Sequence, residues 1–205
     1  MASEQELSID RREAIRRVSA LLGGVALVGG SAIWTGCARD RAAVVASSAG
    51  VGAFTPPDIA LLDDVADTIL PETSTPGARA AHTGAFMAMM VTDCYDERDQ
   101  KIFKDGMAKL DAAARTAGAA SFTAATPAQR LSVLEALDRE QKAYMDAKKP
   151  DDPAHYFRMM KELALLGYFT SEIGYTKAQR YVESPGRFDS CVPYHPGDKA
   201  WAPHA

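Results

Sequence analysis

The sequence predicts an all-α protein: a single helical domain of about five to six helices with an extended C-terminal tail. Within residues 54–205, apolar residues recur at three- and four-residue spacing. This spacing is the period of an amphipathic helix. Alanine, the strongest helix former, is abundant, and aromatic residues make up only 8% of the chain. A length of 205 residues is enough for one domain with its own core. We therefore expect this domain over residues 54–205, preceded by an export segment over 1–37 and a flexible tether over 38–53.

The charge of the chain excludes one class of function. The formal net charge is −4 at neutral pH. Proteins that bind DNA or RNA gain much of their affinity by neutralising phosphates with basic side chains, so they carry a positive surface. We therefore expect no nucleic-acid partner.

The N-terminal segment has the layout of an export peptide, with a basic start, an apolar middle and a small-residue end. Arg11 and Arg12, with an apolar residue at the expected offset and then a further cation, resemble a twin-arginine signal. The apolar stretch 18–34 contains four glycines, so it is less hydrophobic than an ordinary membrane span. The sequence predicts export to the periplasm, and a retained transmembrane helix is the alternative.

Cys37 follows two small residues at the end of the apolar stretch, as in a lipoprotein cleavage box. An acylated cysteine at the new N-terminus can hold a protein at a membrane when it carries two or more chains. Cys37 is therefore a lipidation candidate, and simple cleavage near Ala38 or Ala46 is the alternative. The stretch 38–53 is rich in alanine, serine and glycine, which is typical of a flexible tether.

Two cysteines remain beyond the export segment, Cys94 and Cys191. In an oxidising compartment such a pair favours a disulfide, and two buried thiols are the alternative. A metal site is not expected, because neither cysteine has a second ligand at the short spacing that zinc sites use.

The first helix is predicted from about residue 57 to Leu70, where Pro71 ends it because proline cannot continue the hydrogen-bond ladder. A loop over 72–77 follows, and a second helix is predicted over about residues 78–95. The residues expected on the inner faces of these helices are Leu62, Val65, Ala66 and Ile69, and then Phe86, Met89 and Met90.

The third helix is predicted from Glu97 to about residue 117, with Gly118 as its C-terminal cap. Thr126 and Gln129 form a capping-box pattern that begins the fourth helix, and an Asp-Pro pair at 152–153 begins the fifth. A short sixth helix over 177–182 and an extended tail from about residue 183 complete the domain. The expected inner faces are Ile102, Phe103, Leu110 and Ala113, then Leu131, Leu134 and Leu137, then Phe157, Met160, Leu163 and Leu166.

Motifs for catalysis and for cofactors are absent from the sequence. It contains no nucleotide-binding glycine pattern, no G-x-S-x-G and no H-E-x-x-H. The four histidines lie on separate segments without a ligand at metal-binding spacing, and the acidic pair Asp63-Asp64 is typical of a solvated helix face. We expect no catalytic, cofactor-binding or metal-ligating residue in this chain.

Several segments carry a family resemblance: 67–73 leading into 75–78, then 166–174, then 181–191 and the terminal Ala200-Trp201. With the paired arginines at the start, they resemble the small subunit 3 of membrane-associated gluconate 2-dehydrogenase and FAD-dependent glucose dehydrogenase complexes. In such complexes a flavoprotein of the glucose–methanol–choline class oxidises a sugar or sugar acid and passes electrons to a cytochrome c subunit. The resemblance implies that FAD belongs to the partner flavoprotein, and that this chain has no redox centre.

The resemblance implies a non-catalytic subunit that escorts the flavoprotein during export and assists its folding. The cleavage box at Cys37 departs from the simple cleaved signal of many members, and an acylated Cys37 would anchor the complex to the membrane. Small and aromatic residues favour close contact with such a partner. The residues expected at this interface are Gly167, Tyr168, Phe169, Tyr175, Tyr181 and Trp201. Core packing is the alternative for Tyr168 and Phe169.

Two other functions remain open from the sequence. One is a stand-alone extracytoplasmic enzyme with acid–base groups among Tyr168, Ser171, Glu172 and His195. The other is a free-standing periplasmic lipoprotein with a structural or binding role.

Overall fold

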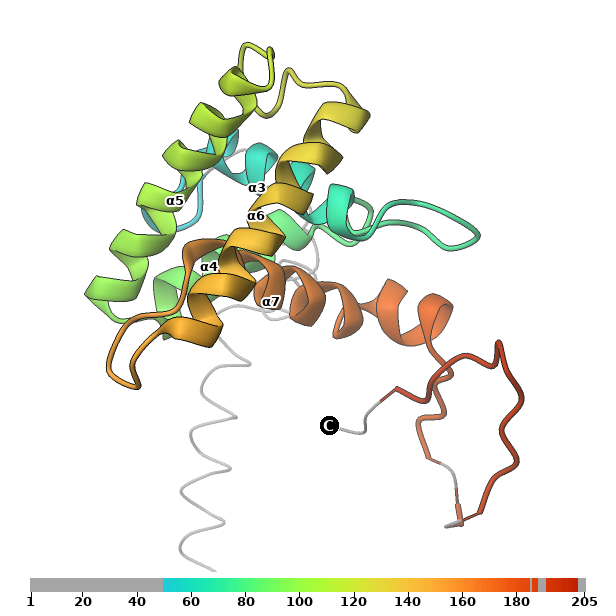
Figure 1. The fold of residues 1–205 in the computed structure, drawn as a ribbon. Coiled ribbons are helices and arrows are strands. Elements are labelled where there is room, and N and C mark those ends of the chain that lie inside the picture. Colours follow the sequence, from blue (N-terminus) through green and yellow to red (C-terminus); the bar gives the residue numbers. More distant parts are fainter. Residues whose placement is uncertain (1–49, 185, 188–190, 203–205) are drawn as a thin grey trace, which may run out of the picture. The chain divides into compact units, whose positions relative to one another are not determined.

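The computed structural model describes residues 50–184, 186–187 and 191–202, and the predicted all-α class is confirmed there (Figure 1). The predicted export segment, with Arg11, Arg12 and Cys37, lies outside these residues. Within them, none of the helices combines the length and the apolar character needed to span a membrane. The helices are α3 (Pro56–Ile69), α4 (Thr83–Cys94), α5 (Glu97–Thr116), α6 (Pro127–Ala147), α7 (Tyr156–Phe169) and the π-helix η1 (Gly174–Ala178).

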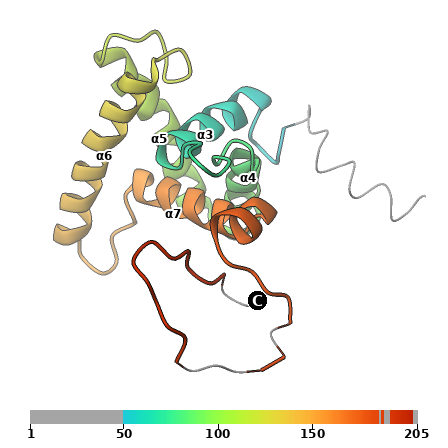
Figure 2. The same cartoon turned by 90° about the vertical axis from the view of Figure 1, so that its right-hand side faces the viewer.

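Helix α7 is the centre of the domain, and it packs against α3, α4, α5 and α6 (Figures 1 and 2). A helix with neighbours on several sides must be apolar over most of its circumference. Eight of the fourteen residues of α7 are accordingly buried, including Phe157, Met160 and Leu163 as predicted. Leu166 was expected on the same face, but it lies on the outer side of α7 and is exposed.

Local capping signals set several helix ends. Thr126 and Gln129 form the predicted capping box of α6, with Thr126 N donating to Gln129 Oε1 at 2.9 Å. A second capping box begins α3, where the Asp58 carboxylate accepts from both the backbone N and the hydroxyl of Thr55. Gly118 has φ +84°, as predicted for a residue that ends α5 in the left-handed region.

Helix α4 begins later than the sequence predicts, and its inner face also differs from the predicted one. Residues 78–82 form turns, and His82 has φ 52°, so the regular helix starts at Thr83. Met87 and Val91 are buried, whereas Met89 is exposed, which corrects the prediction that Met89 faces the core. The turns depend on bonds to distant residues, which local spacing does not reveal.

Three further predictions are corrected. In α6, Leu131 is exposed and Val133 is buried in its place. Helix α7 begins at Tyr156, after His155 caps it with Nδ1 accepting from Phe157 N at 3.2 Å, rather than at the Asp-Pro pair. The short sixth helix is the π-helix η1, which starts three residues before the predicted segment.

Asp64 was expected on a solvated face of α3, but it is buried and joins distant segments. Its carboxylate accepts hydrogen bonds from the guanidinium groups of Arg79, which precedes α4, and Arg130 on α6, the latter at 2.7 Å. Arg130 also donates from Nε to the carbonyl oxygen of Phe122 at 3.0 Å. One carboxylate therefore ties α3 to the start of α4, to α6 and to the loop before α6.

Asp63 accepts a hydrogen bond from the start of α4. Its Oδ1 accepts from the backbone N of Gly84 at 2.7 Å, and this bond satisfies one of the free donors at the start of α4. Burial raises the pKa of Asp63, although the Gly84 N–H and the Arg79 charge oppose that shift. The carboxylate thus fixes the approach of α3 and α4.

Gly84 permits this approach, and its replacement by alanine tests how close it is. A Cβ at this position would lie 2.6 Å from Ile59 O and 2.7 Å from Asp63 N, both of them backbone atoms. We expect Gly84→Ala to lower the free energy of unfolding by about 1–3 kcal/mol, because backbone atoms must move apart. Helix propensity alone would raise stability, by up to roughly 1 kcal/mol. Urea unfolding followed by circular dichroism gives the sign, and a stabilised variant contradicts the tight helix crossing.

Candidate partner-binding surface

Two of the residues predicted to contact a partner are buried. A Cβ on Gly167 would lie 2.5 Å from Cδ1 of Phe86, so this glycine allows α7 to approach α4. Tyr168 is buried as well, and its hydroxyl donates to the carbonyl oxygen of Pro76 at 2.8 Å. Both residues therefore serve internal packing, which is the alternative that the sequence left open for Tyr168. Phe169 is half-buried, with its ring edge-on to that of Tyr168.

The bond from Tyr168 holds a protruding loop, residues 71–77, beside the C-terminal end of α7 (Figures 1 and 2). Within the loop, Thr73 N donates to Thr75 O at 3.0 Å, and Ala78 N donates back to Leu70 O at 2.9 Å. Residues 71–74 are exposed. The loop is thus fixed at its base and presents its tip to solvent.

The C-terminal segment, predicted as an extended tail, contains no helix in its described residues and is closed by two backbone hydrogen bonds. Arg180 N donates to Ala200 O at 2.8 Å, and Ala202 N donates to Arg180 O at 2.9 Å. The Arg180 guanidinium lies over the indole ring of Trp201, 4.6 Å from its centroid. We call residues 179–202 the C-terminal loop, because the chain leaves the helices after η1 and returns to its starting point (Figures 1 and 2).

The remaining predicted interface residues gather at the base of the C-terminal loop. The rings of Tyr175 and Tyr181 meet edge to face at 5.5 Å between centroids. Tyr181 and Trp201 are exposed, and Tyr175 is half-buried. Tyr175 and Tyr181 therefore contact each other and Trp201 contacts Arg180, whereas Gly167 and Tyr168 are buried in α7.

Sequence reasoning missed three exposed apolar residues of the C-terminal loop: Val182, Val192 and Tyr194. A signal was present, because a turn built from Pro196 and Gly197 follows Tyr194 directly. Gly197 has φ +95°, and Asp198 N donates to His195 O at 3.0 Å, which is the pattern of a type II turn. Such a turn fixes the course of the returning chain and so the position of Tyr194.

The structure shows no disulfide between Cys94 and Cys191 in the described part of the chain, so this pairing stays a prediction. Both side chains are exposed, so the alternative of two buried thiols is wrong. Cys94 ends α4, with its Sγ 4.0 Å from Met90 Sδ, whereas Cys191 lies on the C-terminal loop. A disulfide needs Cα atoms within about 7 Å, and the loop closes on Arg180 instead of on α4.

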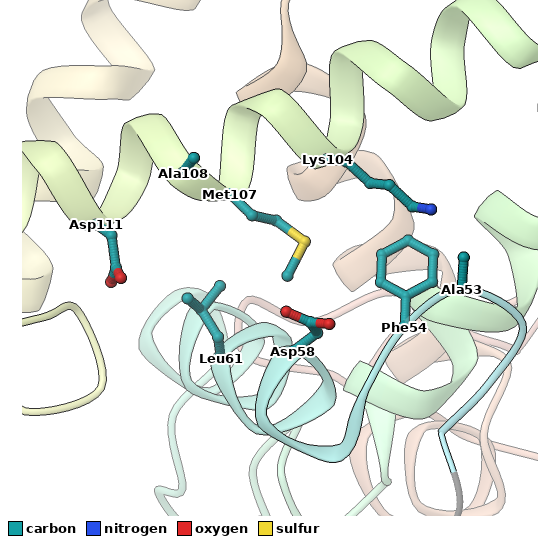
Figure 3. Close-up of a pocket in the computed structure, with 8 residues that line it drawn as sticks. All are labelled: Ala53, Phe54, Asp58, Leu61, Lys104, Met107, Ala108 and Asp111. Atoms are coloured by element: carbon teal, nitrogen blue, oxygen red, sulfur yellow. The ribbon is translucent and has the colours of Figure 1, made fainter.

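A cavity of about 310 Å³ lies between α3 and α5 (Figure 3). Its carboxylates already serve the fold, since Asp58 caps α3 and Asp111 Oδ1 accepts from Phe122 N at 2.8 Å. Lys104 Nζ lies 5.2 Å from the centroid of the Phe54 ring. Among the residues that the structure describes, no group of three or more histidines, cysteines and acids is placed to hold a metal ion.

The structure is a helical domain with two protruding segments, the loop 71–77 and the C-terminal loop, on the side where α7 ends (Figure 2). The family model described as Gluconate 2-dehydrogenase subunit 3 matches residues 56–186, which is more than half of the chain. The chain therefore belongs to the gluconate 2-dehydrogenase subunit 3 family. No curated protein and no solved structure matched it significantly.

Proposed function

We propose that this chain is the non-catalytic small subunit of a periplasmic FAD-dependent dehydrogenase complex that oxidises a sugar, gluconate or a glucoside. The observation that carries the proposal is the family match over residues 56–186, which covers every helix of the domain. The catalytic flavoprotein holds the FAD, and a cytochrome c subunit receives the electrons. The small subunit binds the flavoprotein, stabilises it and escorts it across the membrane.

The proposed export role has a physical reason. A flavoprotein that folds around FAD in the cytoplasm must cross the membrane already folded, and the twin-arginine route carries folded proteins. One signal, with Arg11 and Arg12, can then serve two chains if they associate before export. Acylation of Cys37 would keep the complex at the membrane surface, because two or more acyl chains anchor a protein stably.

The positions of the residues proposed for a stand-alone enzyme favour the accessory role. The Tyr168 hydroxyl donates to Pro76 O, and Ser171 Oγ donates to Tyr168 O at 2.6 Å while it accepts from Gly174 N. These two hydroxyls hold the backbone around the end of α7. His195 lies in a turn of the C-terminal loop, and its ring is largely exposed.

Co-expression with the flavoprotein subunit tests the proposal. We expect the two chains to elute together in size-exclusion chromatography, with FAD absorbance in the shared peak and dye-linked dehydrogenase activity. The flavoprotein expressed alone is expected to give less soluble, less FAD-loaded protein. The small subunit alone should oxidise neither gluconate nor glucose with a dye acceptor, and turnover by that sample contradicts the proposal.

A further inference from the structure

Five large apolar side chains of the C-terminal loop are exposed among its described residues. Exposure is 48% for Val192, 71% for Tyr194 and 49% for Trp201. Tyr181 and Val182 on the outgoing limb are exposed as well. Single exposed apolar residues are common on the surface of a monomer and need no explanation. Several of them on one protruding segment instead indicate a contact site.

The base of this loop is fixed rather than loose. The two backbone bonds between Arg180 and its neighbours at 200 and 202 close it, and Ala202 is buried. Lys199 Nζ donates to the carbonyl oxygen of Lys177, and the Arg180 guanidinium stacks on Trp201. A loop whose base is fixed before binding loses less entropy when it docks than a free chain segment does.

The charge of the loop distinguishes a protein partner from a membrane. Segments that bind anionic lipid surfaces carry clusters of basic residues. Residues 181–202 instead contain two basic residues, Arg187 and Lys199, and three acidic residues, Glu183, Asp189 and Asp198. The nearly equal numbers of basic and acidic residues argue against a membrane. The aromatic and β-branched side chains are of the kind that bind in an apolar groove of a folded protein.

We propose that the C-terminal loop is a preformed docking element that inserts Val192 and Tyr194 into an apolar groove of the catalytic flavoprotein subunit. Arg180 acts as a positioning residue, because it closes the loop through its backbone and holds Trp201 with its side chain. This inference rests on the proposed function, which supplies the partner. The family match ends at residue 186, before Val192 and Tyr194. The match therefore assigns no role to these two residues.

The test measures binding of the full mature chain to the flavoprotein subunit by biolayer interferometry. We expect Val192→Ser combined with Tyr194→Ser to weaken the Kd by about 30-fold or more, as for removal of central interface residues. The matched control is Met89→Ser with Leu131→Ser, two residues of α4 and α6 that are 43% and 49% exposed. The control should bind like the wild type, and both variants should keep wild-type circular dichroism.

Substitutions of Arg180 provide a second test, in which the association and dissociation rates are measured. Arg180→Ala keeps the two backbone bonds but removes the guanidinium that lies over Trp201, so the base of the loop is held less firmly, and we expect association to slow about threefold with an unchanged dissociation rate. Arg180→Lys keeps a cation over Trp201 and should recover part of the rate. A change confined to dissociation shows a direct contact and overturns the positioning role.

The failures of the two proposals are distinguishable. If the wild-type chain does not bind the flavoprotein, the proposed function itself is wrong. If the wild type binds and the loop variant binds equally well, only the docking inference is overturned. It is also overturned if the loop variant loses self-association or binding to anionic vesicles while it keeps its affinity for the flavoprotein.

Discussion

Replacing Asp64 with asparagine is expected to lower the free energy of unfolding by about 3 kcal/mol or more, the range measured when one partner of a buried ion pair is removed. The Asp64 side chain is only 7% exposed, and it accepts from Arg79 and from Arg130, whose side chain is 18% exposed. Asparagine has nearly the same shape, so packing is kept while the negative charge is lost. The Arg130 guanidinium then stays near the core without a neutralising partner.

The adjacent residue provides the control for this prediction. In Asp63→Asn the amide oxygen can still accept from Gly84 N, and the carboxylate that burial makes harder to ionise is removed. We expect a stability within about 0.5 kcal/mol of the wild type at neutral pH, or slightly above it. Because the pKa of Asp63 is raised by folding, its charged form costs stability above that pKa. Any gain from asparagine should therefore vanish below the pKa of the unfolded chain, about 3.9.

Urea unfolding at pH 7 and at about pH 3, which is below the unfolded-chain pKa of Asp of about 3.9, measures both variants when it is followed by far-ultraviolet circular dichroism. The essential result is the difference between two neighbouring, isosteric substitutions on one helix. Equal and small losses for Asp63→Asn and Asp64→Asn contradict the buried ion cluster.

Local signals in the sequence predicted much of the fold. The Thr126–Gln129 capping box and Gly118 marked their helix ends because capping depends on residues within one turn. Asp64 was misread because its partner Arg130 lies 66 residues further along the chain. The start of α4 was misplaced for a similar reason, since its turns are held by the acids of α3.

The candidate surface could be predicted only in part. Aromatic and small residues near the end of α7 were identified, but periodicity did not show that α7 is covered on several sides, which buries Gly167 and Tyr168. The closure of the C-terminal loop on Arg180 depends on two backbone bonds between residues about twenty positions apart. Such long-range pairing has no local sequence pattern, so Tyr194 was not singled out.

The largest effect is expected on export: replacing Arg11 and Arg12 together with lysine should leave the flavoprotein and its dehydrogenase activity in the cytoplasm, although the flavoprotein sequence is unchanged. The substitution keeps both charges. It removes the planar, forked guanidinium donors, whose geometry an ammonium group does not reproduce. If the export machinery reads the arginine pair, the signal is lost for both chains at once.

Activity assays on separated periplasmic and cytoplasmic fractions measure this effect. Arg16→Lys is the matched control, because it makes the same change outside the pair and should leave the distribution unaltered. A version of the chain that begins near Ala53 should still form an FAD-loaded complex in the cytoplasm, since the helices and the C-terminal loop lie beyond that point. Normal export of the flavoprotein with the double variant contradicts the escort role. Export of a flavoprotein that is fully active and stable without this chain favours the free-standing lipoprotein instead.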